Sequence, residues 1–492
     1  MDKHEMTNGD KQHDDEHEKK ESGKYIYSFS FWRRIQTSQT VKVVMIGVLI
    51  LLLQIPIVKI AFVIQERQVR SRQAADEIAT KWGREQTILG PIISVPFVEM
   101  SIVASDPKKG LTGGLSSGSG TVVFVDDSQG SNSSRVIKQH KVAHFLADDL
   151  HIKVQTENMV RHRGIFQQPV YRAEIELSGI FKRPDFAKLN AEPTEIFWDR
   201  ATLTILVSDP RTISNKASLK WNKEELEFQP ASMELDDNRK GIEVPLKGHW
   251  QGENFTFAAK LSLQGSKGLF LSPMAGSTTA ELVSNWPHPS FQGEWLPIEH
   301  ASGDAGTQAN WQISALGSQF EQQWIGSPYK EKNFAKNLFG VTFLQPVDTY
   351  RMVERSVKYQ FLFLVLTFLS LWLAEVLAEV RLHALHYLLI GSGMCLFYLL
   401  ELSLAEHLGF LLAYCLAASA IVGLVSCYCL AILESFKRAV TIGGFITFLY
   451  GYLYTLLINQ DYSLLAGSIA LFVLLAAVMY LTRHINWATL RG

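Results

Sequence analysis

The sequence predicts a multi-pass α-helical membrane protein with six transmembrane helices and a large β-rich (α+β) exported domain between helices 1 and 2. Three observations lead to this class. The apolar run at 41–64 is long enough to cross a bilayer, because a spanning helix needs about 20 residues. Residues 361–481 carry only 9 charged side chains. Between these regions, at 65–355, apolar and polar residues alternate with the period of two that is typical of half-buried strands.

The N-terminal segments differ sharply in composition. Residues 1–24 hold almost no apolar side chains, which predicts a disordered, charged cytoplasmic tail. Residues 25–40 combine aromatic side chains with Arg33 and Arg34, a composition that favours the lipid headgroup layer. No small-residue cleavage site follows the run at 41–64, so we expect transmembrane helix 1 to be an uncleaved signal anchor.

The segment at 65–355 is predicted to be mainly strands. In VYRAEIEL (170–177) the residues Tyr171 to Leu177 alternate between apolar and charged, and 255–263 alternates in the same way. Helices are expected at 66–82 and 349–359, which continue into the flanking spans. The length is ample for a large core, in one or two lobes. Further strands are expected at 92–98, 122–125, 151–155, 203–207, 242–246, 278–283 and 340–345.

Five more spans and a short tail at 482–492 complete the chain. Orientation follows from the basic residues in the short connections, since cytoplasmic loops are enriched in Lys and Arg. Alternate connections hold Arg381, then Lys437 and Arg438, and finally Arg483 and Arg491, whereas 403–407 and 459–461 hold none. This pattern predicts that both termini are cytoplasmic and that 65–355 is exported. The five spans are expected at about 361–378, 386–402, 408–430, 439–458 and 462–481.

Composition and motifs exclude several function classes. With 47 Lys and Arg against 48 Asp and Glu, the chain lacks the basic excess of a nucleic-acid binder. All four cysteines lie within 395–429, so a disulfide framework elsewhere is excluded. The common nucleotide, zinc-protease and kinase motifs are absent from the sequence. We therefore predict no enzymatic activity, cofactor or metal; the expected partners are the lipid bilayer and an unknown periplasmic or membrane component.

Three weaker patterns favour structural roles. Residues 114–118 match the G-x-S-x-G nucleophile pattern, but they lie in a Gly/Ser-rich stretch rather than between a strand and a helix. A metal site at His140, His144 and His151 would need 140–144 to be helical, whereas the context favours a loop that enters a strand. Four tryptophans could bind sugars, but burial in a core is the preferred interpretation. They are Trp286, Trp295, Trp311 and Trp324.

Acidic residues within the spans are the strongest functional candidates. An ionised group at the centre of a spanning helix costs about 2.5–3.5 kcal/mol on insertion scales, so an acid there usually has a partner or a task. Glu375 lies about one turn deeper than Glu379 in the second span, and Glu401 lies in the third. Glu406 and His407 follow in the outer connection. A proton or cation pathway and interfacial positioning are both open explanations.

Several sequence segments resemble the CreD family of inner-membrane proteins of Gram-negative bacteria. The resemblance covers roughly 40–487; it implies a periplasmic β-rich domain on a helical bundle, a link to envelope integrity and colicin tolerance, and expression tied to a two-component envelope response. It supplies no catalytic or ligand-binding residues. The acidic tail and the Gly/Ser-rich insertion near 105–134 depart from the pattern. The segments are QTILGP (86–91), RHRGIFQQPVY (161–171), SDPR (208–211), SNWPHPSFQGEWLP (284–297), FGVTFLQPVDTY (339–350), RSVKYQFLFLVLTF (355–368), HYLLIG (386–391), FYLLELSLAEHLGF (397–410), LYGYLYTLL (449–457) and DYSLLAGSIALFVLLAAVMYLTR (461–483).

Three functional hypotheses follow. The first is a non-enzymatic protein that supports cell-envelope integrity and the envelope stress response, with a periplasmic domain that contacts envelope or wall components. The second is a proton- or ion-coupled transporter or channel that uses Glu375 and Glu401. The third is a membrane-embedded enzyme acting on lipid-linked wall precursors, which would require polar residues that converge on one membrane face.

Overall fold

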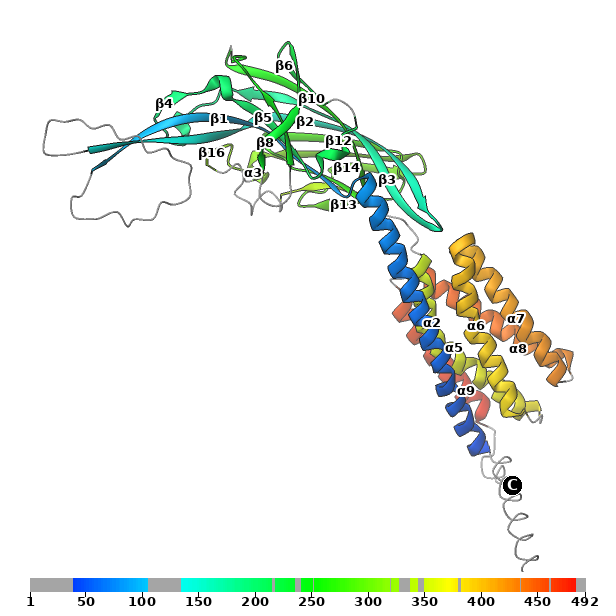
Figure 1. The fold of residues 1–492 in the computed structure, drawn as a ribbon. Coiled ribbons are helices and arrows are strands. Elements are labelled where there is room, and N and C mark those ends of the chain that lie inside the picture. The colour runs from blue at the N-terminus through cyan, green and yellow to red at the C-terminus, as the bar shows by residue number, and fades with distance from the viewer. Residues whose placement is uncertain are drawn as a thin grey trace, which may run out of the picture. The chain divides into compact units, whose positions relative to one another are not determined.

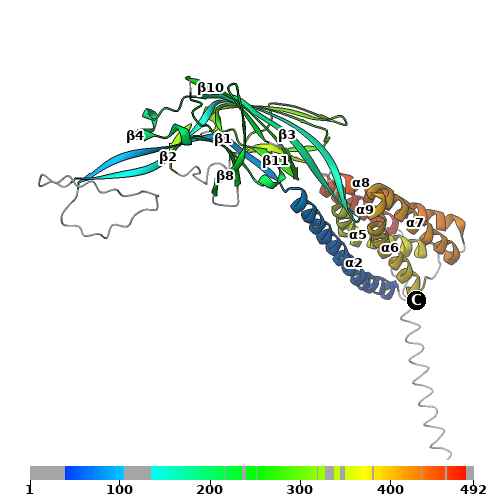
Figure 2. The same ribbon diagram turned by 45° about the horizontal axis from the view of Figure 1, so that its top comes forward.

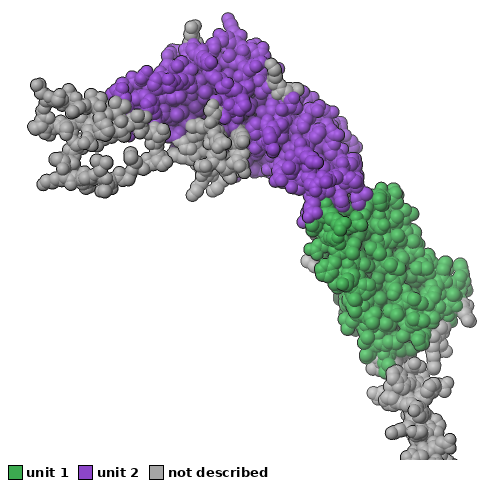
Figure 3. Space-filling model, viewed as in Figure 1, with its two compact units in different colours: residues 1–70, 347–492 green, residues 71–346 purple. Residues whose placement is uncertain are grey.

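The computed structural model divides into two compact units, which Figure 3 shows in different colours. Unit 1 comprises residues 1–70 and 347–492, and unit 2 comprises 71–346. The predicted tail at 1–24, the Gly/Ser-rich pattern at 114–118 and the candidate strand at 122–125 lie outside the described residues. The structure describes residues 39–104, 134–214, 217–234, 240–250, 252–318, 320–326, 337–343, 349–378, 382–433, 435–459 and 462–483.

Unit 1 is helical (Figure 1). Among the described residues, five helices are long and apolar enough to cross a membrane, namely α2, α5, α6, α7 and α8. The sixth predicted run forms helix α9, and its crossing stays a prediction. The predicted helices at 66–82 and 349–359 are confirmed as parts of α2 and α5. The bounds are α2 Gln39–Trp82, α5 Thr349–Ala378, α6 Ala384–Leu408, α7 Phe410–Leu433, α8 Phe436–Ile458 and α9 Ser463–Thr482.

A glycine brings three of these helices together. Gly391 of α6 is buried, and a Cβ built on it would lie 2.3 Å from Leu53 Cδ1 of α2 and 2.8 Å from Phe368 Cζ of α5. Small residues permit such close approach in lipid, where apolar burial alone gives no drive for helix association. The close contact of α2, α5 and α6 therefore depends on the absence of a side chain at position 391.

The variant Gly391→Val is expected to lower the free energy of unfolding by about 1–3 kcal/mol, because the added atoms overpack the contact with Leu53 and Phe368. Unfolding of the full chain in mixed detergent micelles, followed by circular dichroism, measures this change. Gly423→Val in α7 is the matched control, since a Cβ there meets nothing within 4 Å. Equal losses in the two variants would contradict the packing role.

Unit 2 is built from two sheets of mainly antiparallel strands. In sheet 2 the strands pair in the order β7-β6-β10-β3-β2-β12-β15-β14, with β12 and β2 parallel. In sheet 1, β1 pairs with β5 and β4 on one edge and with β11 and β2 on the other. Sheet 1 continues from β5 through β9 to β8, from β11 through β17 to β13, and from β2 to β16.

Where the structure describes them, the connections between strands include short turns and single helical turns. The strand bounds are β1 Gln86–Ala104, β2 Ser134–Arg163, β3 Phe166–Lys182, β4 Pro193–Ile196, β5 Thr202–Val207, β6 Ser218–Trp221, β7 Glu224–Glu227, β8 Gln229–Glu234, β9 Lys240–Pro245, β10 Asn254–Ser266, β11 Gly268–Leu271, β12 Ala275–Ser284, β13 Pro289–Gly293, β14 Glu299–Gly303, β15 Gly306–Ser314, β16 Gln323–Ile325 and β17 Phe339–Phe343. The helical turns are η1 Ala187–Leu189, η2 Trp198–Arg200, η3 Pro210–Thr212 and α3 Ala315–Ser318.

Strand β2 belongs to both sheets. Its first part pairs with β1, from Ser134 opposite Ala104 to Leu146 opposite Ile92, and Figure 2 shows these two strands running side by side. Its second part pairs with β3 and β12 in sheet 2. The prediction that 140–151 contains a loop was wrong, because the chain is extended throughout this stretch. Five consecutive residues, 143–147, are buried where β2 passes from one sheet to the other, so the alternation that identifies a strand is lost there.

Both sheets contribute to one hydrophobic core. In β3 the residues Tyr171, Ala173, Ile175 and Leu177 are buried, as the sequence predicted. They join one cluster with Phe97 and many other side chains of β1, β5, β10 and β12. The preferred interpretation of the tryptophans as core residues is supported: Trp311 and Trp324 are buried, and Trp286 and Trp295 pack against the cluster. One shared core favours a single lobe.

Candidate functional site

The negative charge of Glu375 is balanced by a lysine of a neighbouring helix. Its carboxylate, 3% exposed on α5, forms an ion pair with the Lys42 ammonium of α2. The Tyr387 hydroxyl of α6 donates to Oε2 at 2.9 Å. A buried ion pair is tolerated when further hydrogen bonds satisfy its remaining lone pairs. The cluster therefore fixes three helices to one another and gives the buried acid a structural partner; Glu379 and Arg381 lie outside the described residues.

Glu401 has the opposite environment. Its side chain on α6 is 0% exposed, and neither carboxyl oxygen has a hydrogen-bond partner among the described residues. The Ser356 hydroxyl of α5 lies close enough to interact with the carboxyl, but it also lacks a hydrogen bond of good geometry. Tyr398, Tyr414 and Tyr450 are near enough for the charge of Glu401 to act on them. An unpartnered carboxyl in such surroundings is far more stable neutral than ionised.

The other two candidates lie at the end of α6. Glu406 Oε1 accepts a hydrogen bond from the Tyr350 hydroxyl of α5 at 3.1 Å, and its Oε2 lies 3.9 Å from Arg67 Nη1 of α2. His407 is exposed. The two Glu406 contacts are typical of a residue that positions the end of a helix.

The four candidates do not form one cluster. Helices α5 and α6 are antiparallel, with Tyr350 bonded to Glu406 near one end and Glu375 bonded to Tyr387 near the other. Ser356, beside Glu401, precedes Glu375 by 19 residues, which corresponds to about 28 Å along a helix. The bundle thus contains two separate buried acids, one paired and one unpaired.

The histidines of β2 do not assemble a metal site. His144 is buried: Nε2 donates to the Gly326 carbonyl at 3.0 Å, Nδ1 accepts from the Ser94 hydroxyl at 2.8 Å, and the ring stacks on Trp324. Burial lowers the pKa of His144 to about 4. His140 and His151 are exposed, and His151 pairs with a threonine hydroxyl. Within the described part of the chain, no three metal-binding side chains gather at one point.

The sequence did not identify several polar residues of unit 1 that form contacts between helices. Lys42 lies near the start of the first apolar run, and it pairs with a residue 333 positions away. Gln54 and Gln360 form a hydrogen bond of 2.6 Å between α2 and α5. The available signal was the presence of isolated polar side chains within apolar runs, which in lipid usually have a partner. That signal indicates importance but does not identify the partner.

Comparison with known proteins decides the family. The chain matches the family described as "Inner membrane protein CreD" over residues 38–488. The chain belongs to the CreD family. Inner membrane protein CreD of Escherichia coli (strain K12) is 30% identical over 443 residues, which cover 89% of this chain and 91% of that protein. A two-domain M1 zinc metallopeptidase structure aligns with a TM-score of 0.19 at 9% identity, over 43% of this chain and 53% of that one. This similarity is too low to indicate a shared fold or function.

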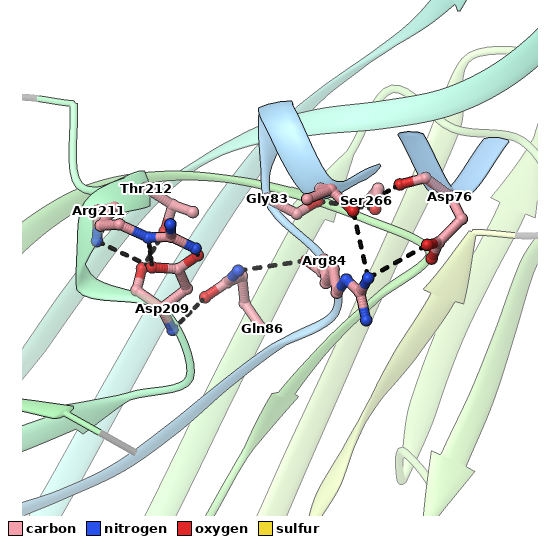
Figure 4. Close-up of polar contacts among 9 residues, drawn as sticks. Asp76, Gly83, Arg84, Gln86, Asp209, Arg211, Thr212 and Ser266 are labelled. Atoms are coloured by element: carbon pink, nitrogen blue, oxygen red, sulfur yellow. Dashed lines mark hydrogen bonds and ion pairs between the residues drawn. The ribbon is translucent and has the colours of Figure 1, made fainter. Parts of the chain in front are cut away.

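Two segments that carry the CreD resemblance meet in unit 2 (Figure 4). Gln86, fully buried at the start of β1, accepts from the Asp209 N–H at 3.4 Å and donates to the Arg84 carbonyl at 3.2 Å. The Arg84 guanidinium reaches back to Asp76 of α2 at 3.1 Å. Arg211 binds Asp209 through side chain and backbone, and this bonding lowers the pKa of Asp209. Together these contacts join the end of α2 to the loop after β5, which is a structural role.

Proposed function

We propose that this CreD-family chain supports cell-envelope integrity, with unit 2 in the periplasm contacting envelope or wall components. The observation that carries the proposal is the connectivity of unit 2. Both of its chain connections lead into helices apolar enough to cross a membrane, α2 and α5. A large domain held at both ends by membrane helices is suited to binding at the membrane surface rather than to diffusing.

A non-enzymatic role is part of this proposal. The family description and the name of the E. coli relative are those of a membrane protein and name no reaction. The buried His144 and the Asp209–Arg211 pair are both engaged in structural hydrogen bonds. The basic residues of alternate loops support cytoplasmic termini and a periplasmic unit 2.

Deletion of the chain from its native cells is expected to raise envelope permeability and sensitivity to wall-targeting agents, because the binding protein at the membrane surface is lost. Dye-uptake and growth-inhibition assays measure the change, and the full chain supplied in trans should restore both. Unchanged permeability and sensitivity after deletion would count against the proposal. In vivo crosslinking from Lys260→Cys, an exposed position of β10, should capture a periplasmic or membrane component.

The same cysteine tests the proposed orientation. An impermeant maleimide added to outer-membrane-permeabilised cells should label Lys260→Cys but not Lys437→Cys, an exposed position in the first turn of α8. The background protein has Cys395, Cys415, Cys427 and Cys429 replaced by serine. The reverse labelling pattern would place unit 2 in the cytoplasm.

A second candidate function, a proton- or ion-coupled transporter, is favoured by one observation. Glu401 is buried without a hydrogen-bond partner among the described residues, whereas Glu375 is paired with Lys42. Intramembrane acids often serve ion or proton pathways. The two glutamates that the sequence placed together in this role are therefore separated, and Glu401 is the stronger candidate.

A further inference from the structure

Three unpartnered polar groups of unit 1 fall along one face of α5, and a fourth lies on α6. Ser356 Oγ, Gln360 Oε1 and Thr367 Oγ1 are buried and lack hydrogen-bond partners among the described residues, as do both oxygens of Glu401. All four side chains are at most 7% exposed. In the described part of unit 1 these are the buried side-chain oxygens and nitrogens without a partner.

The spacing on α5 places these groups in a row. At about 100° per residue, Gln360 and Thr367 lie within about 40° of Ser356 around the helix axis. The row rises about 16 Å from Ser356 to Thr367. Glu401 of α6 adjoins its Ser356 end, and the Glu375–Lys42–Tyr387 cluster lies about 12 Å beyond Thr367 along α5. Glu375 lies about 28 Å from Ser356 along the helix axis, a distance close to the roughly 30 Å thickness of the hydrocarbon core, and about 100° from it around the axis, so the row on this face ends at Thr367.

The cost of leaving such groups unbonded points to internal water. A buried polar group without a hydrogen bond costs roughly 1–3 kcal/mol, so four in one row are not expected to stay dry. Buried waters in proteins usually bridge polar groups of this kind. The Gln360 amide nitrogen donates to Gln54 of α2, and this bond holds the side chain in place while its carbonyl oxygen has no partner among the described residues.

We propose that this row is a hydrated proton path through the bundle, with Glu401 as its proton-binding group. The inference rests on the second candidate function above. The neutral Glu401 acid passes its proton to a water molecule hydrogen-bonded to Ser356, which leaves a carboxylate and a hydronium ion. The carboxylate then takes a proton from another hydronium ion, which leaves water and restores the neutral acid. Water held by Gln360 and Thr367 carries the proton toward Glu375.

The surroundings of Glu401 favour a proton over a metal cation. The titratable groups that face it are Tyr398 of α6, Tyr414 of α7 and Tyr450 of α8. Tyr414 donates its hydroxyl hydrogen to the Tyr450 carbonyl at 2.6 Å. The nearest basic residue in sequence to Ser356, Arg355, is engaged with the Leu456 and Leu457 carbonyls. One carboxyl and one hydroxyl fall short of the oxygen cage that a metal cation requires.

Proton flux into liposomes tests the path. The full chain is reconstituted with an internal pH-sensitive dye, and a potassium gradient with valinomycin sets the membrane potential. Glu401→Gln and Thr367→Val are each expected to lower the flux by at least about tenfold, because each removes a proton carrier or a water-binding hydroxyl. The matched controls are Glu406→Gln, whose carboxylate is bonded to Tyr350, and Thr447→Val, whose hydroxyl bonds within its own helix.

The outcomes separate the path from the transport function. Near-wild-type flux in both controls, with loss in both path variants, supports the proposal. Wild-type flux in Glu401→Gln or in Thr367→Val overturns the path while transport itself stands. Flux of the wild-type chain no greater than that of protein-free liposomes overturns the transport function and the path with it. Size-exclusion elution and circular dichroism verify that each variant is folded.

Discussion

The single variant Glu375→Gln is expected to lower the free energy of unfolding of the full chain by about 3–5 kcal/mol, the usual cost of removing one partner from a buried ion pair. The amide can still accept the Tyr387 hydrogen bond, but Lys42, whose side chain is only 15% exposed, is left as an unpaired buried charge. Titration of the unfolded fraction with sodium dodecyl sulfate in mixed micelles measures the loss.

A double variant and a surface pair provide the controls. Lys42→Met combined with Glu375→Gln should recover most of the loss, because both charges are then removed together. Glu354→Gln breaks the exposed i,i+4 pair with Lys358 on α5 and should cost less than about 0.5 kcal/mol. If the double variant were no more stable than Glu375→Gln alone, the stability would not come from the pairing of these charges.

Unit 2 is expected to lose stability as the pH falls from 6.5 to 4, in part because of His144. Its folded-state pKa, about 4, lies below the unfolded value of 6.5, so the unfolded chain binds one more proton within this window. The contribution of the neutral ring is complete above pH 6.5 and is lost as the pH falls toward 4. A slope of about 1.4 kcal/mol per pH unit gives a loss of about 3 kcal/mol.

Urea unfolding of the full chain in detergent, followed by tryptophan fluorescence, measures this effect, since Trp324 stacks on His144. The variant His144→Asn removes the titration, so its stability should decline less steeply over the same pH range. Carboxylates such as Glu99 and Asp209, whose pKa values are lowered by Lys141 and Arg211, contribute with the same sign in both proteins. His151→Asn is the exposed control and should retain the wild-type slope; identical slopes for all three proteins would refute the role of His144.

Local patterns predicted the elements of this fold well. The alternation at 171–177 identified β3, and apolar runs identified the helices of unit 1, because burial of one face imposes a period that is visible in the sequence. The long strand β2 was only partly recognised, since residues 143–147 are all buried and show no alternation of apolar and polar side chains.

The acidic residues of the candidate site were predictable from the sequence, but the contacts that each of them makes were not. An acid within an apolar run indicates a special environment, so Glu375 and Glu401 were both identified. Their difference depends on Lys42, which comes from a helix 333 residues away in the chain. The row on α5 was missed because serine, threonine and glutamine are individually common in membrane helices, and only the burial of Ser356 and Thr367 gives them significance.

The sharing of β2 between the two sheets constrains how unit 2 can be divided. Neither sheet is complete without this strand: sheet 1 needs it opposite β1, and sheet 2 needs it between β3 and β12. A fragment that ends at residue 146 would leave the edge of β3 unpaired and open to association with other chains. The two sheets therefore form a single cooperative folding unit, and recombination between relatives within β2 would have to exchange both sheets together.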